Sequence, residues 1–152
     1  RGVSPERGAL AVSAMGIAGL AGRLATGGLL DRFAGSRVSF ILLTISALGT
    51  VLLSQARSFE TGLVAASLIG FGMGGENDVT PYLLSRYFGL RSFSTLFGIA
   101  YGGSAVAGAL GPVLLGRTFD RTGSYEELLF QLALVTFSTG LLMLTLPRYS
   151  GP

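Results

Sequence analysis

The sequence predicts an all-α protein, a polytopic helical bundle embedded in a membrane, and three observations support this fold class. Only 12% of the 152 residues are charged, whereas soluble domains carry about 25%. Five apolar segments approach or exceed the length of about 20 residues that a helix needs to cross the hydrocarbon core. The 24 glycines follow no collagen-like period, and small residues let membrane helices pack closely.

The first two expected spans cover 5–30 and 38–53. Ser4 is the expected N-cap of the first span, and Pro5 takes its first helical position, where the missing N–H of proline is harmless. The second span is short and contains no ionised side chain. A polar loop over 31–37 separates the two.

The other three expected spans cover 59–88, 93–119 and 125–146. The third follows Ser58, and a turn over 89–92 separates it from the fourth. Ahead of the fifth, Ser124 and Glu127 have the spacing of a capping box. Together with the first two spans, these segments predict a transmembrane bundle of five helices.

Short connections indicate a single transmembrane domain over residues 1–152, because no loop is long enough to hold a soluble domain. The chain begins at Arg1 without an initiator methionine or a signal-peptide pattern. Its first span begins almost at once. We therefore expect a C-terminal fragment of a longer membrane protein.

The composition narrows the classes of function. Without Cys or His, the chain lacks thiolate nucleophiles and the commonest metal ligand and general base. We expect no metal site and no cofactor, and any proton chemistry must use carboxyl groups. The arginines are scattered rather than clustered, which argues against a nucleic-acid partner. The short loops disfavour an enzyme, while a non-transporting membrane scaffold or receptor stays open as an alternative.

The chain repeats one pattern. A Gly-x-x-x-Asp-Arg sequence followed by Gly-Ser begins at Gly27 and again at Gly116. The two copies end the first and fourth spans, so an offset of three spans would invert the second copy in the membrane. Inverted repeats are typical of secondary transporters.

The loop after the first span carries a distinctive sequence. It reads Gly27-x-Leu29-x-Asp31-Arg32-Phe33, followed by Gly35 and Arg37. This resembles the signature loop of the major facilitator superfamily, although Ser36 stands where that family usually has a basic residue. The resemblance implies that Gly27, Asp31, Arg32 and Arg37 form a cytoplasmic gate motif that contacts the other half of a transporter.

Three further stretches agree with that family. Residues 86–91 resemble its turn between the tenth and eleventh helices, and Gly108-x-x-Gly111-Pro112 resembles a degenerate form of its Gly-Pro motif. Residues 116–125 resemble the end of the eleventh helix in monocarboxylate-transporter-like members. The branch indicated is the monocarboxylate-transporter-like or oxalate–formate-antiporter-like one of bacterial type.

The resemblance covers nearly the whole chain and implies helices 8 to 12 of a twelve-helix fold. It implies a secondary active transporter, proton- or ion-coupled, that carries a small solute by symport or antiport through alternating access. A monocarboxylate or another organic anion is the solute class that the branch suggests. The implied partners are this solute, a proton, the lipid bilayer and the missing N-terminal half.

The resemblance also implies an orientation. The chain would lie in the plasma (inner) membrane, with 31–37, 89–92, Arg148 and the C-terminus on the cytoplasmic side. Segments 38–53 and 128–146 contain no ionised side chain and would face lipid.

Three ionisable residues lie inside the expected spans: Arg23, Glu76 and Asp78. Such residues are costly in a bilayer and are functional candidates by default. We expect Arg23 to pair with Asp78 or Glu76 at a similar depth, or the pair to serve only as a salt bridge between helices. The two acids are about 200° apart around one helix, so they cannot share a face.

Arg23 resembles the eighth-helix arginine of monocarboxylate transporters, which contacts the substrate carboxylate. Gly19 stands where those transporters have an acid one turn earlier, so a coupling acid would come from the third span. Asn77 and Tyr101 complete the expected substrate-binding or coupling set. Helix bending and close packing are expected at six further residues: Pro81, Gly102, Gly103, Gly108, Gly111 and Pro112.

Overall fold

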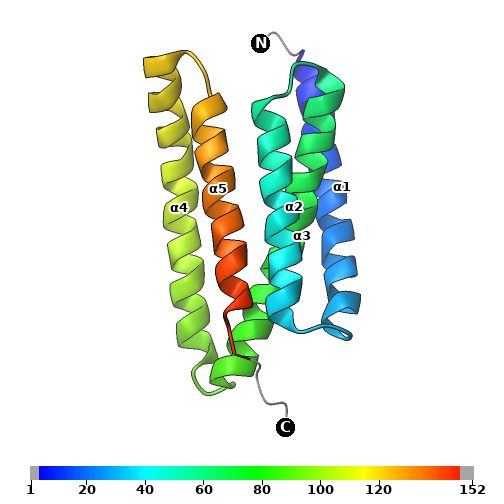
Figure 1. Ribbon diagram of the computed structural model, residues 1–152, viewed down its shortest axis with the longest axis vertical. Coiled ribbons are helices and arrows are strands. Elements are labelled where there is room, and N and C mark those ends of the chain that lie inside the picture. Colours follow the sequence, from blue (N-terminus) through cyan, green and yellow to red (C-terminus); the bar gives the residue numbers. More distant parts are fainter. Residues whose placement is uncertain (1–3, 148–152) are drawn as a thin grey trace.

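The computed structural model describes residues 4–147 and confirms an all-α fold (Figure 1). The helices are α1 (Pro5–Leu30), α2 (Gly35–Ser54), α3 (Phe59–Phe88), α4 (Phe93–Thr122) and α5 (Glu126–Leu144). No strand occurs within the described residues. Successive helices run in opposite directions, as the short connections require.

Ser4 caps α1 as predicted, and Ser58 also caps its helix, α3. The Ser4 hydroxyl accepts a hydrogen bond from the Arg7 N–H at 3.4 Å, and the Ser58 hydroxyl accepts one from the Thr61 N–H at 3.2 Å. Each satisfies one of the donors left free at a helix N-terminus.

The predicted capping box before α5 is wrong by one residue. Tyr125, not Ser124, is the N-cap, and it has no side-chain hydrogen bond at the helix end. The Ser124 hydroxyl accepts instead from the Glu126 N–H at 3.2 Å, while the Glu127 carboxylate accepts from the Gln131 amide at 3.4 Å. Ser124 therefore forms a local turn that precedes the helix.

Helix boundaries differ from the predictions by a few residues. α2 begins at Gly35, three residues early, because Ala34 in an extended conformation is already its N-cap. α4 continues to Thr122, where Gly123 ends it in the left-handed region at φ 69°. Glycine adopts that conformation without steric cost.

Four of the five predicted spans are long and apolar enough to cross a membrane: α1, α2, α4 and α5. α3 has 30 residues, which is also long enough. It is less apolar because it contains several glycines and the polar run 76–78. α1 and α2 both pack along α3, so protein covers much of this less apolar helix.

The core is small and lies between α2 and α3, where Val38, Leu42 and Val79 are buried. α2 also packs against α5. Ile41 and Leu48 of α2 remain exposed, and the expectation that this segment faces lipid stays a prediction. α4 has no buried residue.

The two repeated turns lie at opposite ends of the bundle. In Figure 1 the loop after α1, the turn after α3 and the end of α5 lie at one end of the molecule. The turn after α4 lies at the opposite end, so the two Gly-x-x-x-Asp-Arg patterns are on opposite sides, as an inverted repeat requires. Arg148 and the C-terminus lie outside the described residues.

Candidate functional site

Glycines bring the backbones of α1 and α3 together. A Cβ atom added at Gly22 would fall against the Phe71 carbonyl, and one at Gly74 would fall against the Gly19 carbonyl. Gly70 makes the same kind of contact with the Met15 carbonyl. Any larger residue would force the helices apart, so these glycines fix the register between α1 and α3.

This register places Arg23 of α1 beside Asp78 of α3. The Arg23 Nε lies 3.3 Å from both carboxylate oxygens of Asp78, and one terminal nitrogen lies 3.1 Å from Oδ1. The predicted pairing of Arg23 is therefore present, and its partner is Asp78. The side chains are 54% and 38% exposed, respectively, so another molecule can reach both charges.

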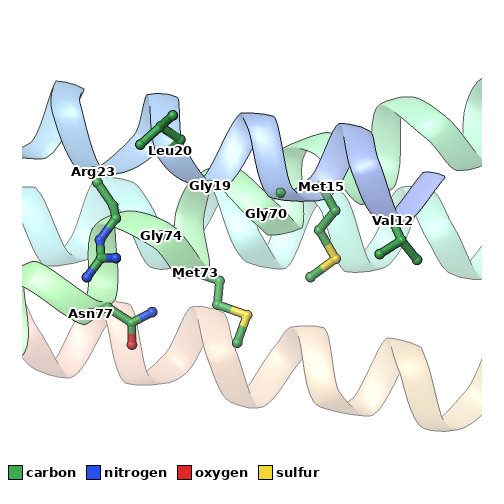
Figure 2. A pocket seen from close by; sticks show the side chains of 10 residues that line it. Val12, Met15, Gly19, Leu20, Arg23, Gly70, Met73, Gly74 and Asn77 are labelled. Atoms are coloured by element: carbon green, nitrogen blue, oxygen red, sulfur yellow. The ribbon is translucent and has the colours of Figure 1, made fainter. Parts of the chain in front are cut away.

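A groove of about 460 Å³ begins at Arg23, the cationic member of this ion pair, and runs between α1 and α3. Figure 2 shows Arg23 and Asn77 at one end, with Met15 and Met73 along its length. The remaining lining residues are small or apolar: Val12, Gly16, Gly19, Leu20, Gly70 and Gly74. The groove thus joins a polar end to an apolar wall.

Glu76 lies on a different side of α3. The Ser46 hydroxyl of α2 donates a hydrogen bond to its carboxylate at 3.0 Å, and a Cβ atom at Gly72 would collide with that hydroxyl. The prediction that the two acids occupy different faces is confirmed. Asp78 faces α1 and the groove end, whereas Glu76 faces α2.

Comparison with known proteins identifies the family. The sequence profile of the Major Facilitator Superfamily matches residues 1–152. The chain belongs to this superfamily. No solved structure matches it significantly.

Two curated relatives are transporters by name. The chain is 36% identical over 97 residues to the uncharacterized MFS-type transporter YhjX of Escherichia coli, covering 63% of this chain and 24% of the relative. It is 27% identical over 135 residues to monocarboxylate transporter 9 of Gallus gallus, covering 88% of this chain and 26% of the relative. The chain thus spans about a quarter of the length of the curated relatives that it matches.

The superfamily loop lies between α1 and α2. Asp31 is the C-cap of α1, and its N–H donates to the Gly27 carbonyl at 3.4 Å. Within residues 4–147 no ion pair joins Asp31, Arg32 or Arg37 to another side chain. Their role as a gate stays a prediction.

Tyr101 lies on α4, outside the set of residues that line the groove. Its side chain is 53% exposed and its ring packs against Phe97 with centroids 4.8 Å apart. Its place in the expected substrate-binding or coupling set stays a prediction.

The described helices do not test the expectation of close packing at the α4 glycines, which stays a prediction. No atom lies within 4 Å of a Cβ added at Gly102, Gly103, Gly108 or Gly111, because no described helix buries α4. Pro81 and Pro112 both lie inside continuous helices. Since Pro81 has no N–H, it leaves the Asn77 carbonyl without its usual helical donor.

Close packing is found instead on α3, where sequence reasoning missed it. The run Gly70-x-Gly72-x-Gly74-Gly75 places glycines on two faces, one toward α1 and one toward α2. Gly75 accommodates the hydroxyl of Thr26, which is fully buried and without a hydrogen-bond partner in the described part of the chain. The dense glycine run on α3 could have indicated this packing from the sequence alone. No sequence pattern pointed to Ser46 or Thr26.

Proposed function

We propose that this chain forms part of a secondary active transporter for a small carboxylate-bearing solute, and that the groove between α1 and α3 is part of the solute path. One observation supports the proposal most strongly: the Arg23 guanidinium is half exposed at the polar end of the groove. A charged side chain inside a membrane-spanning helix is energetically costly, so its presence there indicates a functional role. Similarity to a protein named monocarboxylate transporter 9 points to the same solute class.

The chemistry of arginine suits this task. Its planar fork can donate two parallel hydrogen bonds to a carboxylate. In the structure Asp78 occupies that fork, so a solute carboxylate binds by competing with Asp78. Competition with an internal carboxylate lets the site return to its own ion pair after the solute leaves.

Coupling to a proton requires a carboxyl group that can change its charge. The spans offer two, Asp78 beside Arg23 and Glu76 beside Ser46. We propose that a coupling proton binds at one of them during alternating access. A proton bound to that carboxyl group would neutralise its charge when the conformational change separates it from its partner.

The whole transporter would contain a further half that this chain lacks. The relatives are about four times as long as the matched segments, and α4 presents an unburied, glycine-rich surface. We propose that the other half covers this surface, with Asp31, Arg32 and Arg37 meeting it at the cytoplasmic end. The proposed location is the inner membrane, with the C-terminus in the cytoplasm.

The test is solute binding by the natural full-length protein reconstituted in liposomes. With a panel of radiolabelled short carboxylates, we expect Arg23→Gln to weaken binding at least about tenfold, because a charge-assisted contact to the carboxylate is lost. Arg57→Gln removes the same charge outside the groove and serves as the control. Unchanged affinity in Arg23→Gln would show that the groove does not bind the carboxylate.

A further inference from the structure

The groove carries balanced charge. Among its lining residues only Arg23 is ionised, and Asp78 neutralises it through three contacts of 3.1–3.3 Å. Glu76 is turned toward Ser46 on α2. Within the described residues, the polar end of the groove therefore has one positive and one negative group and no net charge.

Balanced charge discriminates between solutes. A simple anion that takes Arg23 leaves Asp78 without its partner, and an uncompensated charge within a membrane-spanning helix is costly. A solute that brings its own cation avoids this cost, because its carboxylate pairs with Arg23 while its cation pairs with Asp78. One internal ion pair is exchanged for two, and the charge of the site does not change.

We propose, on the basis of the proposed function, that the groove binds a small zwitterion of the α-amino acid class. The two charged side chains touch each other, so the carboxylate and ammonium of the solute must also be close, as they are when a single carbon joins them. Asn77 lies at the same end, and its carboxamide can accept a hydrogen bond from the ammonium. Met15 and Met73 offer a flexible apolar wall to an uncharged side chain.

The experiment measures binding of solutes that share a skeleton and differ only in charge. Two sets are used near neutral pH with the natural full-length protein in liposomes. One set is alanine, lactate and alaninamide, and the other is leucine, 2-hydroxy-4-methylpentanoate and leucinamide. In each set we expect the zwitterion to bind at least about tenfold more tightly than the anion or the cation, as expected where an unpaired charge is avoided.

Variants at the ion pair test the cause of the preference. Arg23→Gln should shift the order toward the cation, and Asp78→Asn should shift it toward the anion. The double variant Arg23→Gln with Asp78→Asn leaves no unpaired charge, so it should fold even if a single variant does not, and it should lose the preference. Glu60→Gln removes a carboxylate from the first turn of α3, away from the groove, and should keep the original order.

Each outcome has a distinct meaning. Tighter binding of the anion in both sets would overturn the zwitterion proposal and leave the carboxylate transporter intact. An order that persists in the double variant would show that the ion pair does not set the preference. No binding of any solute in either set would overturn the proposed solute site together with its preference.

Discussion

The ion pair between Arg23 and Asp78 is the residue-scale feature on which the proposed activity depends. It joins residues 55 positions apart in sequence, and it is partly exposed. Sequence reasoning placed both residues at one depth and predicted a pair with one of two acids. It could not choose between Asp78 and Glu76, because the choice depends on which face of α3 meets α1.

Neutralising either member of the pair should destabilise the protein more than neutralising both. Arg23→Gln or Asp78→Asn leaves one charge without its partner, whereas the double variant leaves none. Partial exposure limits the effect, so we expect a small but measurable coupling between the two variants in a double-mutant cycle. Thermal unfolding of the purified full-length protein in detergent measures it. Additive effects of the two single variants would show that the pair contributes nothing to stability.

At the scale of elements, the helices follow closely from local sequence. Ser4 caps α1 as predicted, because a hydroxyl directly before a helix can accept a hydrogen bond from a backbone N–H of the first turn. The capping box at Ser124 was wrong because Tyr125 lies between it and the helix. Local patterns thus define the helices to within a few residues.

The packing between helices was harder to predict than the helices themselves. Both α3 and α4 are rich in glycine, and composition does not reveal which glycines meet another backbone. In the structure Gly70 and Gly74 of α3 do so, whereas Gly102 and Gly103 of α4 meet nothing. The difference is one of tertiary arrangement, since α3 lies against α1 and α2 while no described helix buries α4.

Substitution of the contact glycines tests this packing. In Gly74→Ala the new methyl group meets the Gly19 carbonyl, so α1 must move away from α3. Overpacking of this kind costs about 1–3 kcal/mol, and we expect a lower thermal unfolding midpoint. Gly62→Ala on the same helix has open space around the added methyl group and is the matched control. Equal midpoints in the two variants would contradict a backbone contact at Gly74.

At the scale of the whole molecule, α4 differs from the other four helices, which pack against one another. α1 and α3 form the groove wall, and α2 supports α3 from another side and carries α5. α4 stands outside this packing. The family was predictable from the loop Gly27–Arg37, because its residues have fixed spacing, and the match over residues 1–152 confirms it. The charge balance of the groove was not predictable from local sequence, because it emerges only when α1 and α3 meet and Arg23 pairs with Asp78.

Energy coupling is a property of the whole transporter, and the two intramembrane acids differ in how they can contribute. Asp78 pairs with Arg23, which lines the proposed solute groove, so Asp78→Asn should weaken solute binding and reduce uphill accumulation and counterflow together. Glu76 contacts α2 and not the groove, so a proton there need not compete with the solute. We therefore expect Glu76→Gln to abolish uphill accumulation and to spare counterflow exchange of solute for solute. Proton-driven uptake and counterflow are compared in liposomes containing the natural full-length protein.

Loss of accumulation with intact counterflow in Asp78→Asn would instead make Asp78 the coupling acid and remove the reason for a solute ammonium. If both variants still accumulate solute against a gradient, the two acids only hold the helices together.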